Sequence, residues 1–310
     1  MTDRIVGKPE AARGHGQMQL RNSACMGLDS RAPQREQRLL EIIGDWVNVD
    51  RSRQSLMKRH PIDKSIVENV VSSSKSRIDM WIRLIDLAKI GKMAEVGVWK
   101  GEFAEATLRA CPTVQRYFMI DPWRRLDRWN KPANVDDHAF EEIYDEALRR
   151  TEFASERRVV LRGTTREVID DVPDRSLDLA YIDGDHTLRG VTIDLVACYP
   201  KVKPGYYLGG DDFCPTIWQH STRFEPTMVF PFALNFAEAV GATIYCLPFN
   251  QFLMRKALNG KRQFVVIDFT GQYWDASLLP QVSPRTLIAR WAREMMPGPL
   301  KKVLLTLRKS

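Results

Sequence analysis

Between residues 93 and 212, short apolar runs alternate with stretches whose apolar residues recur at helical spacing. The apolar runs are MAEVGV (93–98), RYFMID (116–121), RVVLRG (158–163), LDLAYID (177–183) and YYLGGDD (206–212). Strands of this length separated by helices are typical of a mostly parallel sheet with helices packed on both faces. The sequence therefore predicts an α/β protein with a doubly wound, Rossmann-like sheet.

Two later apolar runs, ATIYCLPF and QFLMRKAL, are separated only by Asn250 and predict a closing antiparallel hairpin, while FVVIDF (264–269) predicts one more strand. Helical spacing also occurs before and after this region. We expect four parts: a mobile segment over 1–36, a helical extension over 37–74, the α/β domain over 75–270, and a basic amphipathic helical tail over 271–310.

The net charge of +7 is concentrated at the C-terminal end of the chain. Residues 284–310 contain seven Lys and Arg residues against Glu294 alone, which is +6 of the +7. A basic groove across the domain is therefore not expected, and neither is a nucleic-acid partner. Residues 1–20 lack the apolar core of a signal peptide, no apolar run is long enough to cross a bilayer, and the five cysteines have no paired spacing. These features favour a cytoplasmic location.

In doubly wound sheets, ligands bind beyond the carboxyl ends of the strands. The first apolar run ends in Glu95-Val-Gly97-Val-Trp99-Lys-Gly101, a glycine-bearing turn that opens a helix. Glycines there let the backbone approach a ligand, and the helix N-terminus offers free N–H groups. Trp99 is expected either to flank a cofactor or to cover the sheet edge.

The second and third runs add to this pattern. Asp121 ends the second run, a position and spacing at which an acid typically accepts hydrogen bonds from the hydroxyls of an adenosine ribose. Gly163, Thr164 and Thr165 end the third run and are expected to border the adenine. Because the turn lacks the central glycine of GxGxxG, an adenosine ligand without a pyrophosphate is favoured, and S-adenosylmethionine fits that description.

The motifs E-x-G-x-x-x-G, IDPW (120–123), LDLAYIDGDH and YPKVKPGYYLGGDDF resemble those of the class I S-adenosylmethionine-dependent methyltransferases. More narrowly, they are similar to the metal-dependent O-methyltransferases, and above all to bacterial macrocin-type sugar enzymes that carry IDGDH and GDD. The resemblance covers about 92–256. It implies that Asp183, Asp211 and Asp212 hold a metal ion, with Asp183 also beside the cofactor.

The residues themselves support a cation at this place. Asp183 follows the fourth run, Asp211 and Asp212 follow the fifth, and neighbouring strands would bring all three carboxylates together. Such crowding is unfavourable without a cation, and oxygen ligands select Mg²⁺ or another hard divalent ion. The alternative is that these acids are helix caps or solvated loop residues.

The resemblance leaves two candidates for the catalytic base that would take a proton from the acceptor hydroxyl. His186, three residues after Asp183, occupies the position of the base in several relatives, and its ordinary pKa suits proton removal near neutrality. Asp185 is the position suggested by the sugar-methylating relatives. His186 is the favoured assignment.

The acceptor is expected to be a hydroxyl of a sugar, glycan or secondary metabolite, chosen by the loops 124–138 and 214–230. His220 in the second loop is a candidate for the pocket wall, whereas Asp194 is expected to be a surface or capping residue of its helix and not a ligand. Two other classes stay open: a non-catalytic adenosine-binding protein and a metal-dependent hydrolase. The helical N-terminal region could also pair with another subunit.

Ser283 and Pro284 predict the start of a tail helix, since serine caps helices and proline suits the first turn. Leu287, Ile288, Trp291 and Met295 then recur at helical spacing among arginines. This helix is expected either to dock on the domain or to make a peripheral contact with an anionic membrane surface.

Overall fold

The strands of the computed structural model form one sheet, within the residues that the structure describes: 63–258, 263–273 and 278–296. All of these lie in the second of the two units into which the chain divides, Met57–Ser310. The sheet order is β3-β2-β1-β4-β5-β7-β6-β8. The strands are β1 Lys92–Val96, β2 Arg116–Asp121, β3 Arg158–Arg162, β4 Leu177–Ile182, β5 Val202–Gly210, β6 Thr243–Leu247, β7 Gln251–Arg255 and β8 Val265–Asp268.

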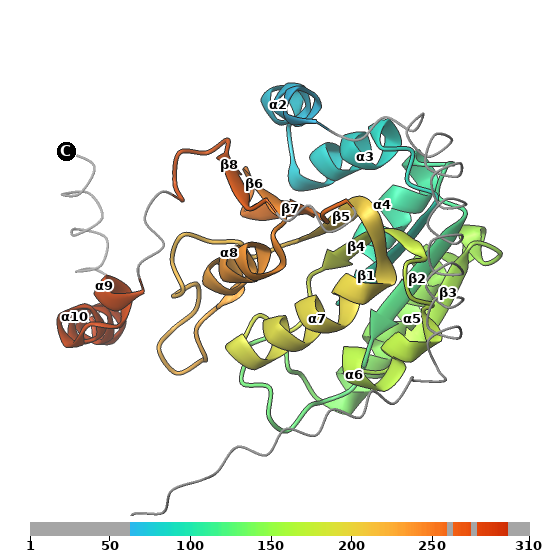
Figure 1. The fold of residues 1–310 in the computed structure, drawn as a ribbon. Helices are drawn as coiled ribbons and strands as arrows, with labels where there is room; N and C mark the ends of the chain where they lie inside the picture. The colour runs from blue at the N-terminus through green and yellow to red at the C-terminus, as the bar shows by residue number, and fades with distance from the viewer. Residues whose placement is uncertain (1–62, 259–262, 274–277, 297–310) are drawn as a thin grey trace, which may run out of the picture. The chain divides into compact units, whose positions relative to one another are not determined.

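Strands β3, β2, β1, β4 and β5 are parallel, and β7 runs antiparallel to both of its neighbours, β5 and β6. The chain builds the sheet outward from β1 to β3, then returns to add β4 and β5 on the other side of β1 (Figure 1). This reversal places a switch point between β1 and β4, where ligands bind in such sheets. The predicted doubly wound sheet and its closing hairpin are confirmed.

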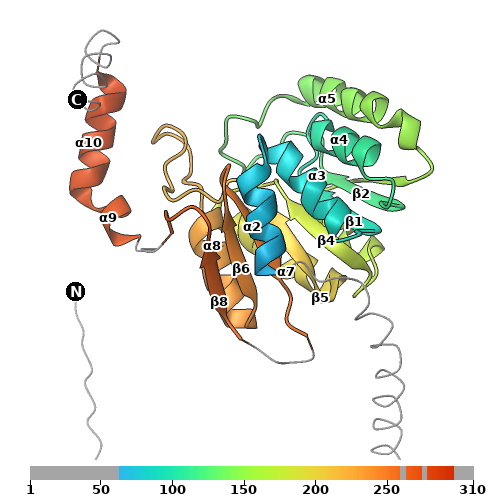
Figure 2. The ribbon, with the colours of Figure 1, turned by 90° about the horizontal axis from the view of Figure 1, so that it is seen from above.

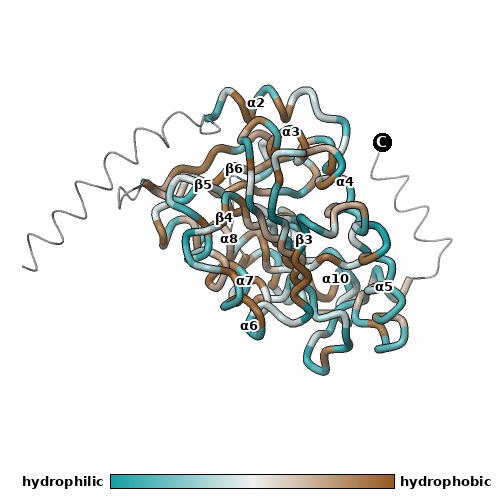
Figure 3. The backbone as a smooth tube through the Cα atoms, turned by 90° about the vertical axis from the view of Figure 1, so that its right-hand side faces the viewer, coloured by the Kyte–Doolittle hydropathy of each residue, from teal (hydrophilic) through white to brown (hydrophobic). Residues whose placement is uncertain are grey.

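Helices cover both faces of the sheet (Figure 2). One face packs against α2 (Lys64–Ser73), α3 (Arg77–Leu87), α4 (Glu102–Ala110) and α5 (Asp137–Arg150), and the other against α6 (Thr165–Val168), α7 (Leu188–Lys201) and α8 (Val229–Val240). Successive residues of a strand alternate between the two cores, because side chains of a strand point to opposite faces. Tyr117 and Met119 of β2 join the first core, while Phe118 and Ile120 join the second. Figure 3 shows much of the apolar colour in the interior of the fold, with hydrophilic colour on many of the outer turns.

Both helical extensions are present in part. The described part of the extension predicted over 37–74 forms α2. Helix α3, which lies inside the predicted α/β domain, is capped by Ser76, whose side chain accepts a hydrogen bond from Asp79 N. The tail forms α9 (Leu279–Val282) and α10 (Pro284–Met295), and α10 begins as predicted with Ser283 as its cap. The segment predicted over 1–36, most of the extension predicted over 37–74 and the residues after 296 lie outside the described residues. No described helix is long and apolar enough to cross a membrane.

Candidate functional site

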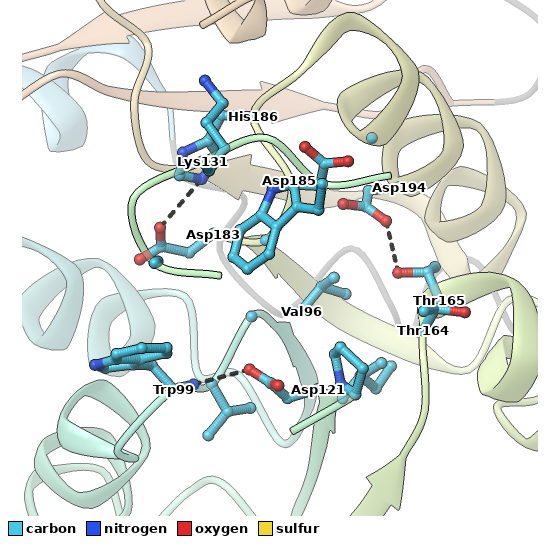
Figure 4. A pocket seen from close by; sticks show the side chains of 18 of the residues that line it. Val96, Trp99, Asp121, Lys131, Thr164, Thr165, Asp183, Asp185, His186 and Asp194 are labelled. Carbon is cyan, nitrogen blue, oxygen red and sulfur yellow. Dashed lines mark hydrogen bonds and ion pairs between the residues drawn. The ribbon is translucent and has the colours of Figure 1, made fainter. Parts of the chain in front are cut away.

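A cavity of about 570 Å³ opens at the carboxyl ends of β1, β2, β3 and β4 (Figure 4). This is the end of the sheet where the sequence placed its candidate residues. The cavity walls include Glu95, Gly97, Trp99, Asp121, Gly163, Thr164, Thr165, Asp183, Asp185 and His186. Pockets for small ligands fall in this size range.

The turn after β1 uses left-handed backbone conformations that its glycines adopt without strain. Gly97 has φ +86° and Gly101, the residue before α4, has φ +77°. A Cβ atom on Gly97 would lie 2.1 Å from the Asp183 carbonyl oxygen, so only glycine fits between the ends of β1 and β4. Trp99 also has a positive φ of 52°, and its ring packs edge-on against Phe140.

Asp121 is held by the backbone on both sides of its carboxylate. Its Oδ2 accepts a hydrogen bond from Trp99 N at 2.9 Å, and its Oδ1 accepts one from Trp123 N at 2.8 Å. Burial raises the pKa of Asp121 to about 6, although these hydrogen bonds oppose the shift. The acid after β2 is therefore fixed beside the glycine turn, as the adenosine interpretation requires.

Glu95 is buried on β1 and accepts a hydrogen bond from the Tyr117 hydroxyl at 2.7 Å. Burial raises the pKa of Glu95 well above its ordinary value, against the effect of the Tyr117 hydrogen bond. Its side chain faces the same cavity as the glycine turn. The structure therefore places Glu95 where the sequence predicted a cofactor contact, in a position that favours its neutral form.

Thr164 and Thr165 begin α6 at the end of β3. Thr164 forms a reciprocal capping arrangement with Glu167. Thr165 Oγ1 donates a hydrogen bond to Asp194 Oδ1 at 2.6 Å.

Asp194 was expected at the surface of its helix, and this expectation is wrong: its residue is only 5% exposed and it lines the cavity. The helix α7 turns this position inward because Gly190, one turn earlier, lets the helix lie against Asp185. A Cβ atom on Gly184 would lie 3.2 Å from Asp194 Oδ2, so the carboxylate also packs beside the end of β4. Burial raises the pKa of Asp194 to about 7.

The three aspartates predicted to share a cation meet at one edge of the sheet, because β4 and β5 are neighbours. Asp183 follows β4, while Asp211 and Asp212 follow β5. The two glycines that end β5 have separate packing roles. A Cβ atom on Gly209 would lie 2.4 Å from the Trp81 ring, and one on Gly210 would lie 2.3 Å from the Ile182 carbonyl oxygen.

A guanidinium that the sequence reasoning missed lies between two of these carboxylates. Arg77 Nη1 donates to Asp183 Oδ2 at 3.1 Å and also contacts Asp211 Oδ2. Asp211 Oδ1 accepts from Asp212 N at 2.6 Å and from Gln251 Nε2. Arg77 comes from the first turn of α3, far from the motifs in sequence, so no local pattern could have indicated it.

His186 lies between the remaining carboxylate oxygens. Its Nδ1 contacts Asp212 Oδ2, and its Nε2 is 3.5 Å from Asp183 Oδ1, a distance that suits an ion pair better than a hydrogen bond. Burial lowers the pKa of His186, but Asp183 and Asp212 outweigh it and raise the pKa to about 10. Asp212 Oδ1 accepts from Gln219 Nε2 at 2.8 Å. Asp185 points into the same cavity and accepts a hydrogen bond from Thr187 N at 2.9 Å (Figure 4).

The donor chemistry of the acid cluster, Asp183, Asp211 and Asp212, fits a hard divalent cation, since its members offer carboxylate oxygens and a positive group already lies between Asp183 and Asp211. In the arrangement seen here, five of the six carboxylate oxygens contact a protein nitrogen, whereas Asp183 Oδ1 is 3.5 Å from His186 Nε2, a buried nitrogen without a hydrogen-bond partner. Among the described residues, no three His, Cys, Asp or Glu side chains are grouped so that they could hold a metal ion. The metal site therefore stays a prediction.

The two loops expected to choose the acceptor lie side by side. Asn130 Nδ2 donates to Arg223 O at 3.0 Å, and Lys131 Nζ donates to Glu225 O at 2.9 Å. Lys131 is 7% exposed and lines the cavity, as does His220. Burial lowers the pKa of Lys131. No pattern in the sequence marked Lys131, because its role depends on the contact between the loops.

The tail helices hold the second of these loops. Trp218 Nε1 donates to Gln281 O at 2.9 Å, and Thr222 N donates to Glu294 Oε1 at 3.0 Å. Arg290 Nη2 donates to the carbonyl oxygens of Trp218 and His220, each at 3.2 Å. The side chain of Trp218 therefore contacts the tail and not the cavity, whereas His220 is at the cavity wall.

Residues 94–213 match a family model described as a methyltransferase domain. The matched segment contains the glycine turn, Asp121 and the acid cluster, together with strands β2 to β5 and most of β1. The part of the chain from β1 to the end of β5 is therefore similar to a methyltransferase domain. No curated protein matches the sequence significantly.

Several solved structures are also similar to this chain. A putative caffeoyl-CoA O-methyltransferase from Staphylococcus aureus has 12% identity and a TM-score of 0.45, covering 72% of this chain and 100% of its own. The O-methyltransferase TomG from Streptomyces achromogenes, solved with SAM, has 13% identity and a TM-score of 0.42, covering 68% and 96%. An O-methyltransferase from Bacillus cereus, solved with SAH, has 15% identity and a TM-score of 0.42, covering 65% and 94%. At such identities, none of these similarities assigns an acceptor.

Proposed function

We propose that this protein transfers the methyl group of S-adenosylmethionine to a hydroxyl oxygen of a small acceptor, a sugar, glycan or secondary metabolite, with the help of Mg²⁺ or another hard divalent cation. The observation that carries this proposal is the shared cavity. One wall holds Asp121 and the glycine turn, and Asp183, Asp212 and His186 line the same cavity (Figure 4). A cofactor site and a site for activating an oxygen nucleophile are thus adjacent.

The cofactor would be held by groups that the fold has already positioned. The Asp121 carboxylate is fixed by two backbone N–H groups, so its free lone pairs can accept from ribose hydroxyls without further ordering. Gly97 lets the backbone approach the methionine portion, and Thr164 and Thr165 border the adenine. Fixing the sulfonium methyl group near the acceptor oxygen is a large part of the catalysis of such a transfer.

The acceptor hydroxyl would lie next to the acid cluster. Asp183, Asp211 and Asp212 would hold the divalent cation, which lowers the pKa of a hydroxyl and orients its oxygen when bound. Asp183 and Asp212 raise the pKa of His186 to about 10, so His186 would act as the base only when a bound cation draws these carboxylates away from the imidazole. His186 would then take the hydroxyl proton as the oxygen attacks the methyl carbon, and S-adenosylhomocysteine would leave. Asp185, in the same cavity wall, is the alternative proton acceptor.

The choice of acceptor would depend on the two joined loops. Leu126, Trp129, Lys131 and His220 line the cavity from these loops, so this part of the wall combines apolar side chains with polar or cationic ones. A cavity of about 570 Å³ leaves room for only a small group beside a nucleoside-containing cofactor. This supports a single ring or sugar unit as the part of the acceptor that enters.

A calorimetric titration tests the cofactor assignment. S-adenosylhomocysteine should bind the full-length protein, and NAD should not, because the turn lacks the glycine that a pyrophosphate needs. If S-adenosylhomocysteine fails to bind at millimolar concentration, the proposed function is wrong.

A double variant, Asp183→Asn with Asp211→Asn, tests the assignment of the acid cluster. It should lose methyl transfer from radiolabelled S-adenosylmethionine to any hydroxyl acceptor found by screening, yet should still bind S-adenosylhomocysteine. The reason is that the acid cluster and Asp121 are held by separate contacts. A folded double variant that transfers methyl groups at the normal rate would contradict the role of these acids.

A further inference from the structure

Arg77 is the feature of the cavity that the proposed function does not use. It is the first residue of α3, upstream of the matched segment 94–213. Its Nη1 atom contacts Oδ2 of Asp183 and Oδ2 of Asp211 at the same time. The protein therefore supplies its own cation at the point where two of the predicted metal ligands meet.

We propose that Arg77 and a divalent cation compete for the same carboxylate oxygens, so that a metal ion binds only when the Arg77 guanidinium leaves the acid cluster. This inference rests on the proposed metal site. It adds a control on that site by an element outside the matched domain.

The two occupants exclude one another for geometric and electrostatic reasons. A hard divalent ion needs carboxylate oxygens at short distance. The oxygens that Asp183 and Asp211 could offer to one ion are their Oδ2 atoms, and both of these face Arg77 Nη1. A guanidinium left in place would also repel the ion, and partial burial of the cluster strengthens that repulsion. The side chains of Asp183 and Asp211 are 23% and 15% exposed.

The guanidinium can leave without the helix leaving. Arg77 is at the end of α3, and its side chain is 34% exposed, so it can turn toward solvent. The body of the helix is held by Trp81, Leu84 and Ile85, which are all buried. Exchange of Arg77 for a metal ion therefore needs a change of rotamer at one end of α3, not undocking of the helix.

A second contact from α3 keeps Asp211 in position during such an exchange. Trp81 Nε1 donates to Gln251 Oε1 at 2.8 Å, and Gln251 Nε2 donates to Asp211 Oδ1. Gln251 is buried, and its amide is also held by the Tyr181 hydroxyl, which donates to Oε1 at 3.0 Å, and by Phe249 O, which accepts from Nε2 at 2.9 Å. Asp211 Oδ1 is thus a fixed acceptor, and Oδ2 is the oxygen that changes partner.

Binding of Mn²⁺, followed by electron paramagnetic resonance, tests the competition directly. Arg77→Met removes the charge while keeping an unbranched side chain, and should bind Mn²⁺ at least tenfold more tightly than the wild type. Arg77→Lys keeps a positive charge and should fall between the two. Arg83→Met is the matched control, because Arg83 is on the same helix but pairs with Asp79.

Thermal melting in the same samples gives a second readout. Arg77→Met leaves Asp183 and Asp211 without their shared cation, so its Tm without metal should be lower than that of the wild type. Added Mn²⁺ should then raise the Tm of Arg77→Met more than it raises the Tm of the wild type or Arg83→Met.

Two results would overturn the proposal, and they are distinguishable. If Arg77→Met binds Mn²⁺ no more tightly than the wild type, the competition is absent and the metal site itself stands. If neither protein binds Mn²⁺, the metal site fails and the competition fails with it. S-adenosylhomocysteine binding in the same samples then shows whether the methyltransferase cavity is intact.

Discussion

Asp121 shows how a single acid can be prepared for a ligand by the backbone around it. Both oxygens accept backbone N–H groups, from Trp99 in the glycine turn and from Trp123 two residues onward. An acid in an exposed turn would have to be ordered when the ligand binds. Here the order exists beforehand, so the loss of this carboxylate should weaken binding directly.

Asp121→Ala should reduce the affinity for S-adenosylhomocysteine by about 10- to 100-fold, the range for losing hydrogen bonds to a charged group. The measurement is calorimetric titration at pH 7.5, above the pKa of Asp121. Asp127→Ala is the control, since Asp127 is an exposed acid in the following loop that does not line the cavity. Equal affinities for wild type and Asp121→Ala would remove Asp121 from the cofactor site.

Asp194 gives a pH dependence of stability at the residue scale. Because burial raises its pKa to about 7 from an ordinary 3.8, folding favours the protonated form. Its contribution to the free energy of unfolding is present below the unfolded pKa and is lost as the pH rises toward 7. Because the side chain of Asp194→Asn cannot ionise, the free energy of unfolding of this variant should not fall for this reason as the pH rises.

Urea unfolding at pH 5 and pH 8 measures the effect. Between these values, the wild type should lose up to about 3 kcal/mol relative to Asp194→Asn. Asp145→Asn, a change at an exposed acid of α5, should follow the wild type. Parallel pH curves for wild type and Asp194→Asn would show that Asp194 is not held neutral by burial.

At the scale of elements, α3 connects the fold to the site. Its Trp81 is fully buried, packs edge-on against Tyr181 of β4 with ring centroids 5.0 Å apart, and fills the space that Gly209 leaves open on β5. The same helix brings Arg77 to the acid cluster. A helix upstream of the matched segment is therefore part of the site.

Trp81→Ala should lower the free energy of unfolding by about 3 to 5 kcal/mol, as expected for removing a large buried aromatic side chain. Leu87→Ala, at the end of the same helix, should cost far less because Leu87 is 48% exposed. Chemical denaturation of both variants checks this. A small effect of Trp81→Ala would mean that α3 contributes little to the core.

At the scale of the whole molecule, one side of the tail contacts the domain and another side is exposed to solvent. Gln281, Arg290 and Glu294 hold the acceptor loop, which supports the docked alternative for this helix. Ile288, Trp291 and Met295 nevertheless point away, being 66%, 59% and 68% exposed. An apolar face with basic residues nearby suits an anionic membrane surface.

The full-length protein should therefore sediment with anionic vesicles at low salt, and a form ending at Val282 should not. Neutral vesicles are the control for charge, because most of the net charge of the chain lies in residues 284–310. If the full-length protein stays in the supernatant with both kinds of vesicle, the tail serves only to hold the acceptor loop.

The sequence by itself determined the order of strands and helices, the glycine turn, and the acids at the strand ends. These features are local: apolar spacing, turn residues and the residue that follows a strand are all visible within a short window. Tertiary structure alone decided which distant groups meet those acids. Arg77 reaches Asp183 across 106 positions, Lys131 reaches Glu225 across 94, and Asp194 turns inward against Thr165. Such pairs depend on how helices and loops pack around the sheet, because burial and charge partners come from elements that are remote in the chain.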